Sequence, residues 1–154
     1  MDTKGLAEKS FIGARHLIQK DLEALPEDVF AKSFGPASRT VADIIFEVNL
    51  VNDHVGTVIR GEPPFDWPED DWIKAPADFQ TKADVIAEFQ KSAQKFLETI
   101  REFSHEQLEE LLILEEKART RFERCQFVTQ HMWYHSGQLN YIQTLIGDDA
   151  MHWG

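Results

Sequence analysis

The chain has 154 residues, 42% of them hydrophobic and 28% charged, and its 27 acids against 16 Lys and Arg give a net charge of −11. This composition predicts one folded domain over residues 1–154 and excludes a disordered or low-complexity chain. The acidic balance argues against nucleic acids and anionic membrane surfaces as partners, because both attract basic residues. No apolar run nears the roughly 20 residues that span a bilayer. With no leader evident and a single cysteine, Cys125, we expect a soluble, cytoplasmic protein without an internal disulfide.

Two amphipathic helices are predicted in the first part of the chain. Apolar residues recur at helical spacing over residues 3–25, and Pro26 blocks continuation of that helix. Ser38 or Thr40 can cap a second helix. Its stripe of mainly β-branched residues has a period of 3.6 and is too long for a strand, and a glycine followed by two prolines ends it.

The helical pattern disappears between residues 61 and 80. This stretch holds four of the six prolines and four large aromatic residues. A loop of this length in a compact domain is usually functional or disordered. Because the aromatic residues favour burial, we expect a loop packed against the domain and not a linker between two domains.

Two further helices are predicted in the second half of the chain. One begins after Thr81 and continues to about residue 103, followed by a short turn over 104–110 and an extended connection over 111–118. The last helix is expected over about residues 120–146. Four helices with one apolar stripe each can bury those stripes together, which predicts an all-α four-helix bundle. The long loops between helices 2 and 3 and between helices 3 and 4 argue against a simple series of hairpins.

The last predicted helix contains two histidines four residues apart, His131 and His135. This spacing places both imidazoles on one face about one turn apart, which suits two ligands of one metal ion. His135 lies near the centre of the apolar stripe and His131 beside it, so both are expected to face the interior. Two interpretations stay open: a metal or catalytic site, or core histidines hydrogen-bonded to a backbone carbonyl or a buried acid.

A third ligand is expected from the second helix. Glu47 lies at the margin of its apolar stripe and, with two imidazoles, would form a set suited to Zn²⁺, Ni²⁺, Mn²⁺ or Fe²⁺. The alternative is that Glu47 is an edge residue paired with a neighbouring base. His54, two turns further along, is more typical of a partly exposed surface residue than of a ligand, and Asn52 is an unusual amide within the stripe.

Other residue types give weaker indications. Cys125 is expected to be a buried, unreactive thiol, since no base is recognisably paired with it. Trp67, Trp72 and Trp153 either cover the core or roof a pocket. Neither a glycine-rich nucleotide loop nor a serine nucleophile elbow is present.

Three stretches resemble a known family: TVADIIFEV at 40–48, HMWYHSGQL at 131–139 and LIG at 145–147. Together with the order of the elements, they resemble the DinB-like superfamily over nearly the whole chain. The resemblance implies an up-down-down-up bundle, commonly dimeric, with a divalent metal held by one histidine of helix 2 and two of helix 4. His131 and His135 match the helix-4 positions. Glu47 stands where the family has its helix-2 histidine, which implies either an altered metal preference or a decayed site.

The resemblance also implies a class of function. Members with assigned activity include transferases that attach low-molecular-weight thiols to electrophiles, and metal-dependent hydrolases or isomerases. The resemblance therefore implies a homodimeric metal-dependent enzyme that acts on a small molecule, with Zn²⁺ or Ni²⁺ preferred over Mn²⁺ or Fe²⁺. A non-catalytic binding or structural module with a vestigial site is the alternative. The negative net charge favours a neutral or cationic electrophile as substrate.

Overall fold

The computed structural model describes residues 2–69, 72–114 and 117–154. Four long helices dominate it: α1 (Thr3–Ala24), α2 (Val41–Ile59), α3 (Lys82–Arg101) and α5 (Arg121–Leu145). The shorter elements are the 3₁₀ turn η1 (Glu27–Val29), helix α4 (His105–Glu109) and strands β1 (Leu111–Leu114) and β2 (Lys117–Thr120).

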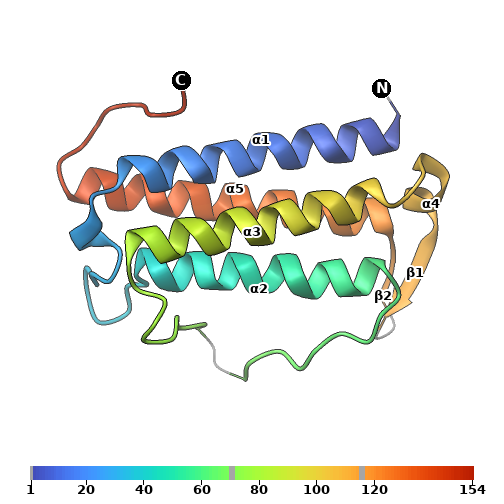
Figure 1. Cartoon of the computed structure of the whole chain (residues 1–154), viewed down its shortest axis with the longest axis horizontal. Helices are drawn as coiled ribbons and strands as arrows, with labels where there is room; N and C mark the ends of the chain where they lie inside the picture. The colour runs from blue at the N-terminus through green and yellow to red at the C-terminus, as the bar shows by residue number, and fades with distance from the viewer. Residues whose placement is uncertain (1, 70–71, 115–116) are drawn as a thin grey trace.

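The four long helices form an up-down-down-up bundle (Figure 1). Helices α1 and α5 run in one direction, and α2 and α3 run in the other. α1 packs against α5 and α3, while α2 packs against α3 and α5, so α1 lies diagonally across the bundle from α2. The predicted all-α four-helix bundle and its topology are confirmed.

Each long helix begins at a side chain that caps its first turn. In all four, the cap oxygen accepts a hydrogen bond from the backbone N–H three residues later, which satisfies a donor that the helix itself leaves unpaired. The caps and donors are Asp2 and Gly5, Thr40 and Asp43, Thr81 and Asp84, and Thr120 and Glu123. These local signals explain why the predicted helix bounds agree closely with the observed ones, with Thr40 rather than Ser38 as the second cap.

The core lies where the four apolar stripes meet. Phe11 of α1 and Phe96 of α3 are almost fully buried, with their ring centroids 5.0 Å apart. Cys125 of α5 belongs to the same core, and burial raises the pKa of its thiol to about 12. The prediction of a buried thiol is therefore confirmed, and at neutral pH this side chain is a neutral apolar group. None of the helices in the described part of the chain combines the length and apolar character of a membrane span.

The connection between α2 and α3 runs back along the bundle, because these neighbouring helices are parallel (Figure 1). Its described part packs on the domain, as predicted: Ile73 and Phe79 are buried, and the Ala75 backbone N–H donates to Asp43 Oδ1 at 2.8 Å. Trp67 and Trp72 are 39% and 55% exposed, so neither is a core residue. Two acids of the loop, at positions 70 and 71, lie outside the described residues.

The predicted extended connection is a β-hairpin. Strands β1 and β2 pair antiparallel, with Leu112 opposite Arg119 and Leu114 opposite Lys117. Leu112 and Leu114 are half-buried, whereas the intervening Ile113 is 74% exposed, so one face of the hairpin turns toward the bundle. Residues 115 and 116 lie outside the described part of the chain. The extended segment was predicted, but the antiparallel pairing of its two halves was not.

A buried acid fastens the C-terminal tail to the bundle. Asp21 of α1 is 2% exposed and accepts hydrogen bonds from Ser136 Oγ at 2.5 Å, Asn140 Nδ2 at 3.0 Å and the Trp153 indole N–H at 2.8 Å. Burial raises the pKa of Asp21, although these three hydrogen bonds act in the opposite direction. The indole N–H of Trp153 therefore attaches the tail to α1 through a hydrogen bond. The sequence did not indicate this contact.

Candidate metal centre

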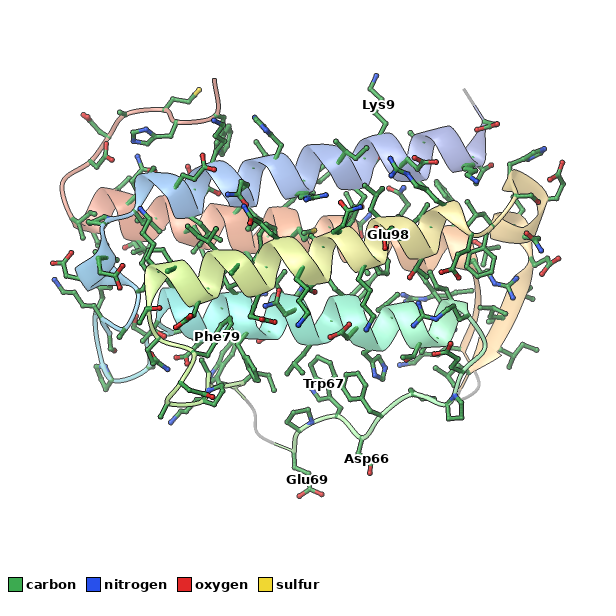
Figure 2. All side chains as sticks on the ribbon, in the orientation of Figure 1. Lys9, Asp66, Trp67, Glu69, Phe79 and Glu98 are labelled. Carbon is green, nitrogen blue, oxygen red and sulfur yellow. The ribbon has the colours of Figure 1, made fainter. Side chains whose placement is uncertain are left out.

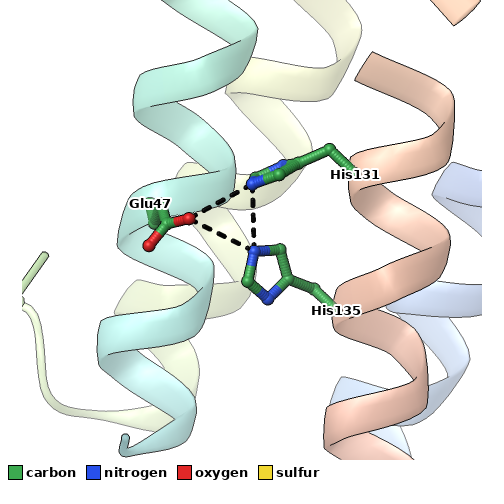
Figure 3. A group of neighbouring side chains, drawn as sticks. All are labelled: Glu47, His131 and His135. Carbon is green, nitrogen blue, oxygen red and sulfur yellow. Dashed lines mark hydrogen bonds and ion pairs between the residues drawn. The ribbon is translucent and has the colours of Figure 1, made fainter. Parts of the chain in front are cut away.

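The packing of α2 against α5 brings together the three residues that the sequence pointed to (Figure 3). His135 Nε2 lies 3.0 Å from His131 Nε2, and Glu47 Oε1 lies 3.2 Å from His131 Nε2 and 3.5 Å from His135 Nε2. The side chain of His135 is fully buried, while those of His131 and Glu47 are 13% and 18% exposed. The expected inward orientation of both histidines is confirmed.

The spacing of the three atoms fits the requirements of a metal ion. Ligand atoms bound tetrahedrally at about 2.0–2.1 Å lie about 3.3 Å from one another. The three observed separations, from 3.0 to 3.5 Å, bracket this value. Glu47, His131 and His135 form a cluster that could hold a metal ion, and no other group of three such side chains occurs in the described part of the chain.

The proton count at the cluster also favours a cation. His135 Nδ1 lies 2.7 Å from Gln138 Oε1, and this acceptor assigns the imidazole proton to Nδ1. His135 Nε2 is therefore an acceptor, and it faces Glu47 Oε1, a second acceptor. A single N–H on His131 Nε2 can donate a hydrogen bond to only one of these two acceptors. A bound cation would satisfy both, so the residues present fit a metal ion better than they fit one another.

Arg39 balances the charge of Glu47. Its guanidinium forms an ion pair with Glu47 Oε2, the oxygen that points away from the histidines, and packs over the Trp72 ring at 5.2 Å. Burial alone would raise the pKa of Glu47, but the hydrogen bond from His131 and the charge of Arg39 outweigh it and hold that pKa well below its usual range. The carboxylate is therefore ionised at neutral pH, the form that binds a metal.

Burial has the opposite electrostatic effect on His131. Desolvation lowers the pKa of its imidazole, and the hydrogen bond with Glu47 offsets this only in part. The neutral imidazole is thereby favoured, and only a neutral imidazole offers a lone pair to a metal. Both partners of this contact are thus held in the protonation states that metal binding requires.

The weaker candidates do not join the cluster. Asn52 is buried, and its Nδ2 donates to Ser92 Oγ at 3.1 Å. His54 packs edge-on against the rings of Phe65 and Trp67, with centroids 5.2 and 5.5 Å away. Neither residue lies in the group formed by the glutamate and the two histidines.

A cleft of about 540 Å³ opens beside the cluster, with Glu47 and His131 on its wall. Trp67 of the long loop also lines it, and Figure 2 shows this side chain pointing toward the bundle while Asp66 and Glu69 point away. The remaining lining residues are Val51, His54, Val55, Val58, Leu114, Lys117, Arg119, Arg124 and Phe127. A small molecule in this cleft would therefore lie next to two of the three candidate ligands.

Two residues of the site were not assigned a role from the sequence. Gln138 follows His135 by three positions, so helical spacing alone could have indicated its contact. Arg39 lies eight residues before Glu47 and outside the helix, and no spacing rule relates the two. Its contact depends on the path of the chain before the Thr40 cap.

Comparisons with known proteins agree with this architecture. Among solved structures, the chain is similar to a conserved protein from Enterococcus faecalis, with a TM-score of 0.75, 16% identity, and coverage of 96% of this chain and 99% of the other. A DinB-like protein from Bacillus cereus has a TM-score of 0.70 and 16% identity, with coverage of 90% of this chain and 89% of the other. One from Bacillus subtilis has a TM-score of 0.74 and 14% identity, with coverage of 96% of each chain. No curated protein matches the chain significantly. At these identities, the structural likeness supports the fold alone.

The family model that matches the sequence covers most of the bundle. It is described as the DinB superfamily and matches residues 10–139, a range that includes Glu47, His131 and His135. The match extends from the first helix to the last. This chain is therefore a member of the DinB superfamily.

Proposed function

We propose that this protein is a metal-dependent enzyme that acts on a small molecule, with Glu47, His131 and His135 as the ligands of one divalent ion. The observation that supports the proposal most is the position of the cluster: its atoms converge at 3.0–3.5 Å, and two of its members line a cleft of about 540 Å³. Three protein ligands leave a coordination position open, whereas structural zinc sites usually have four.

The surrounding residues prepare the site for chemistry. A bound divalent ion supplies Lewis-acid chemistry, because it lowers the pKa of a thiol or of water and so provides a nucleophile at neutral pH. Gln138 fixes the ring of His135, and Arg39 holds the carboxylate of Glu47. The valines and Phe127 of the cleft exclude water from the reacting groups and strengthen electrostatic interactions there.

We propose nucleophilic transfer or hydrolysis as the reaction, with transfer of a low-molecular-weight thiol to an electrophile as the preferred form. Membership of the DinB superfamily supports this choice over unrelated metal chemistry. We place the protein in the cytoplasm, where such thiols are abundant and a free cysteine stays reduced. The alternative is a non-catalytic module with a vestigial site, which requires no stoichiometric ion.

Metal analysis followed by an activity assay tests the proposal. Chelator-treated protein is loaded separately with Zn²⁺, Ni²⁺, Mn²⁺ and Fe²⁺, and we expect about one ion per chain for Zn²⁺ or Ni²⁺. The loaded protein is then assayed with cysteine as thiol and 1-chloro-2,4-dinitrobenzene as electrophile, and with ester substrates for hydrolysis. Absence of any bound ion would contradict the metal site. One ion per chain without turnover of any substrate would contradict the proposed reaction.

The carboxylate ligand is expected to set the metal preference. Replacing it with the family's imidazole should raise the affinity for Zn²⁺ and Ni²⁺ relative to Mn²⁺ by roughly ten-fold, because imidazole suits these ions better than a carboxylate does. The measured variant is Glu47→His combined with Arg39→Gln, since Arg39 otherwise loses its ion-pair partner. Titration with competing chelators gives the affinities. An unchanged ratio, together with full binding by Glu47→Ala, would show that Glu47 is not a ligand.

We also propose that the protein is a homodimer. Large aromatic side chains are exposed on α5, with Trp133, Tyr134 and Tyr141 at 50%, 57% and 66%. An exposed apolar face of this kind favours self-association, in which the same surface meets itself around a twofold axis. Sedimentation equilibrium at micromolar concentration should give twice the mass of one chain, and Tyr141→Arg should shift it toward the monomer. A wild-type mass near that of one chain would contradict the proposal.

A further inference from the structure

The cleft beside the cluster has a positively charged rim, although the chain as a whole carries a net charge of −11. Three cations line it: Arg124 from the first turns of α5, and Lys117 and Arg119 from β2. Among the described residues Glu47 is the one carboxylate in the lining, and Arg39 already neutralises it. Among the described lining residues, positive charges therefore outnumber negative ones, whereas the chain as a whole is acidic.

The hairpin brings these cations to the cleft. Lys117 and Arg119 are two positions apart on β2, so their side chains leave the same face of the strand. The antiparallel register places Leu114 opposite Lys117, and all three residues line the cleft. One face of the hairpin thus supplies both an apolar side chain and two charges to the same cavity.

Arg124 has donors that the described residues leave unused. Its Nη2 reaches the carbonyl oxygens of Leu112 and Lys117 only at 3.5 Å, and its buried Nε has no hydrogen-bond partner in the described part of the chain. Within residues 2–69, 72–114 and 117–154, none of the three cations forms an ion pair with a carboxylate. Burial lowers the pKa of Arg124, the nearby charge of Arg119 lowers it further, and the charge of Glu123 offsets these effects only in part. An anion bound here would offset the repulsion between the charges of Arg119 and Arg124 and would supply acceptors for the Arg124 guanidinium.

The opposite side of the cleft is apolar. Val51, Val55 and Val58 lie one turn apart on α2, and Phe127 faces them from α5. A ligand that fills the cleft therefore meets hydrocarbon along α2 and positive charge at the hairpin. This distribution matches a molecule with an apolar body and one acidic group.

We propose that the cleft binds a small organic anion with an apolar body, whose acidic group is bound by Arg124 with Arg119 and Lys117. The inference rests on the proposed function, because it names the substrate class of the same site. It departs from the neutral or cationic substrate that the net charge favours. Charges farther than about 8–10 Å are largely screened in physiological salt, so the groups lining the cleft decide which ligand enters.

Three probes with the same apolar body test the charge preference. They are 4-phenylbutyrate, 4-phenylbutan-1-ol and 4-phenylbutylamine, measured by calorimetry on chelator-treated protein so that the carboxylate cannot bind a metal. We expect 4-phenylbutyrate to bind at least about ten-fold more tightly than the alcohol, because charge-assisted hydrogen bonds replace neutral ones. The amine should bind most weakly. Equal affinity for the anion and the alcohol would overturn the proposal.

Variants assign the preference to the three cations. Arg124→Gln should remove the advantage of 4-phenylbutyrate over the alcohol and leave affinity for the alcohol unchanged. Because Arg124 is partly buried, the exposed pair Lys117→Gln and Arg119→Gln is a second variant, expected to reduce the advantage without disturbing the fold. Lys91→Gln removes the same charge from an exposed side chain outside the cleft and should change nothing. Retention of the full preference in both cleft variants would contradict the assignment.

The same measurements separate this inference from the metal site. His135 is fully buried and does not line the cleft, so His135→Ala should remove metal binding but leave binding of 4-phenylbutyrate intact. Wild-type protein that binds 4-phenylbutyrate but takes up no metal would therefore contradict only the proposed enzyme. If 4-phenylbutyrate binds solely to metal-loaded protein, the anion binds at the metal and the inference is wrong.

Discussion

Replacing His135 by alanine is expected to weaken binding of Zn²⁺ or Ni²⁺ by at least roughly 100-fold, because loss of an outer partner of a ligand alone typically costs 10–100-fold. The substitution removes the one candidate ligand that is fully buried and whose proton is fixed by Gln138. The two remaining atoms, on Glu47 and His131, would form an incomplete set. Competition with a chelating dye measures the affinity directly.

A matched variant controls for the general effect of losing a histidine. His105 lies on the exposed turn α4 and pairs with the neighbouring Glu106, far from the cluster in the fold. His105→Ala should therefore keep one ion per chain with wild-type affinity. Circular dichroism of both variants shows whether the bundle is intact. Unaltered metal affinity in a folded His135→Ala protein would mean that the cluster is not the binding site.

Removal of the buried acid is expected to have the largest effect on stability. Asp21→Ala leaves Ser136, Asn140 and Trp153 without the acceptor to which all three donate, and we expect it to lower the free energy of unfolding by about 2–4 kcal/mol. It should also release the C-terminal tail, since the Trp153 indole loses its anchor. Urea unfolding gives the first quantity, and the NMR signal of the Trp153 indole N–H reports the second.

An exposed acid provides the comparison for this stability effect. Asp53 forms a surface ion pair with Lys95, and both side chains are largely exposed, at 42% and 59%. Asp53→Ala should therefore change the free energy of unfolding by no more than about 0.5 kcal/mol. A loss of similar size in both variants would show that the three hydrogen bonds to Asp21 do not account for its effect.

The pH dependence of the Asp21 contribution has a definite sign. Because burial raises the pKa of Asp21 in the folded state, the folded protein binds more protons than the unfolded one over this range. The stability that Asp21 contributes should therefore increase as the pH falls through its raised pKa toward its ordinary value of 3.8, and decrease as the pH rises. Other carboxylates, such as Glu47, titrate in the opposite sense, but they cancel when wild type is compared with Asp21→Asn. A difference between these two proteins that is constant with pH would contradict the shift.

Much of the fold could be predicted from the sequence because the relevant signals are local. Helix periodicity, the caps at Thr40, Thr81 and Thr120, and Pro26 after the first helix all act within one or two turns of the chain. The correct topology was predicted only through the family resemblance, because no local signal fixes the direction in which each helix runs.

The candidate site could be predicted in part for the same reason. The i, i+4 spacing places His131 and His135 on one face of any helix that contains them, so their proximity needs no tertiary information. Glu47 belongs to another helix, and its place at the margin of the apolar stripe, together with its matching position in the family pattern, suggested that it meets them. The packing of α2 on α5 brings the three atoms together.

The sequence by itself determined the four helices, the inward pair of histidines and the net charge, because each of these is a local pattern or a sum over residues. Only the tertiary structure decided the ion pair of Arg39 with Glu47, the anchoring of Trp153 by Asp21 and the positive rim of the cleft. These contacts join side chains whose approach depends on how helices, hairpin and tail pack. A sum of charges contains no information about where they lie, which is why an acidic chain can present three cations around one cavity.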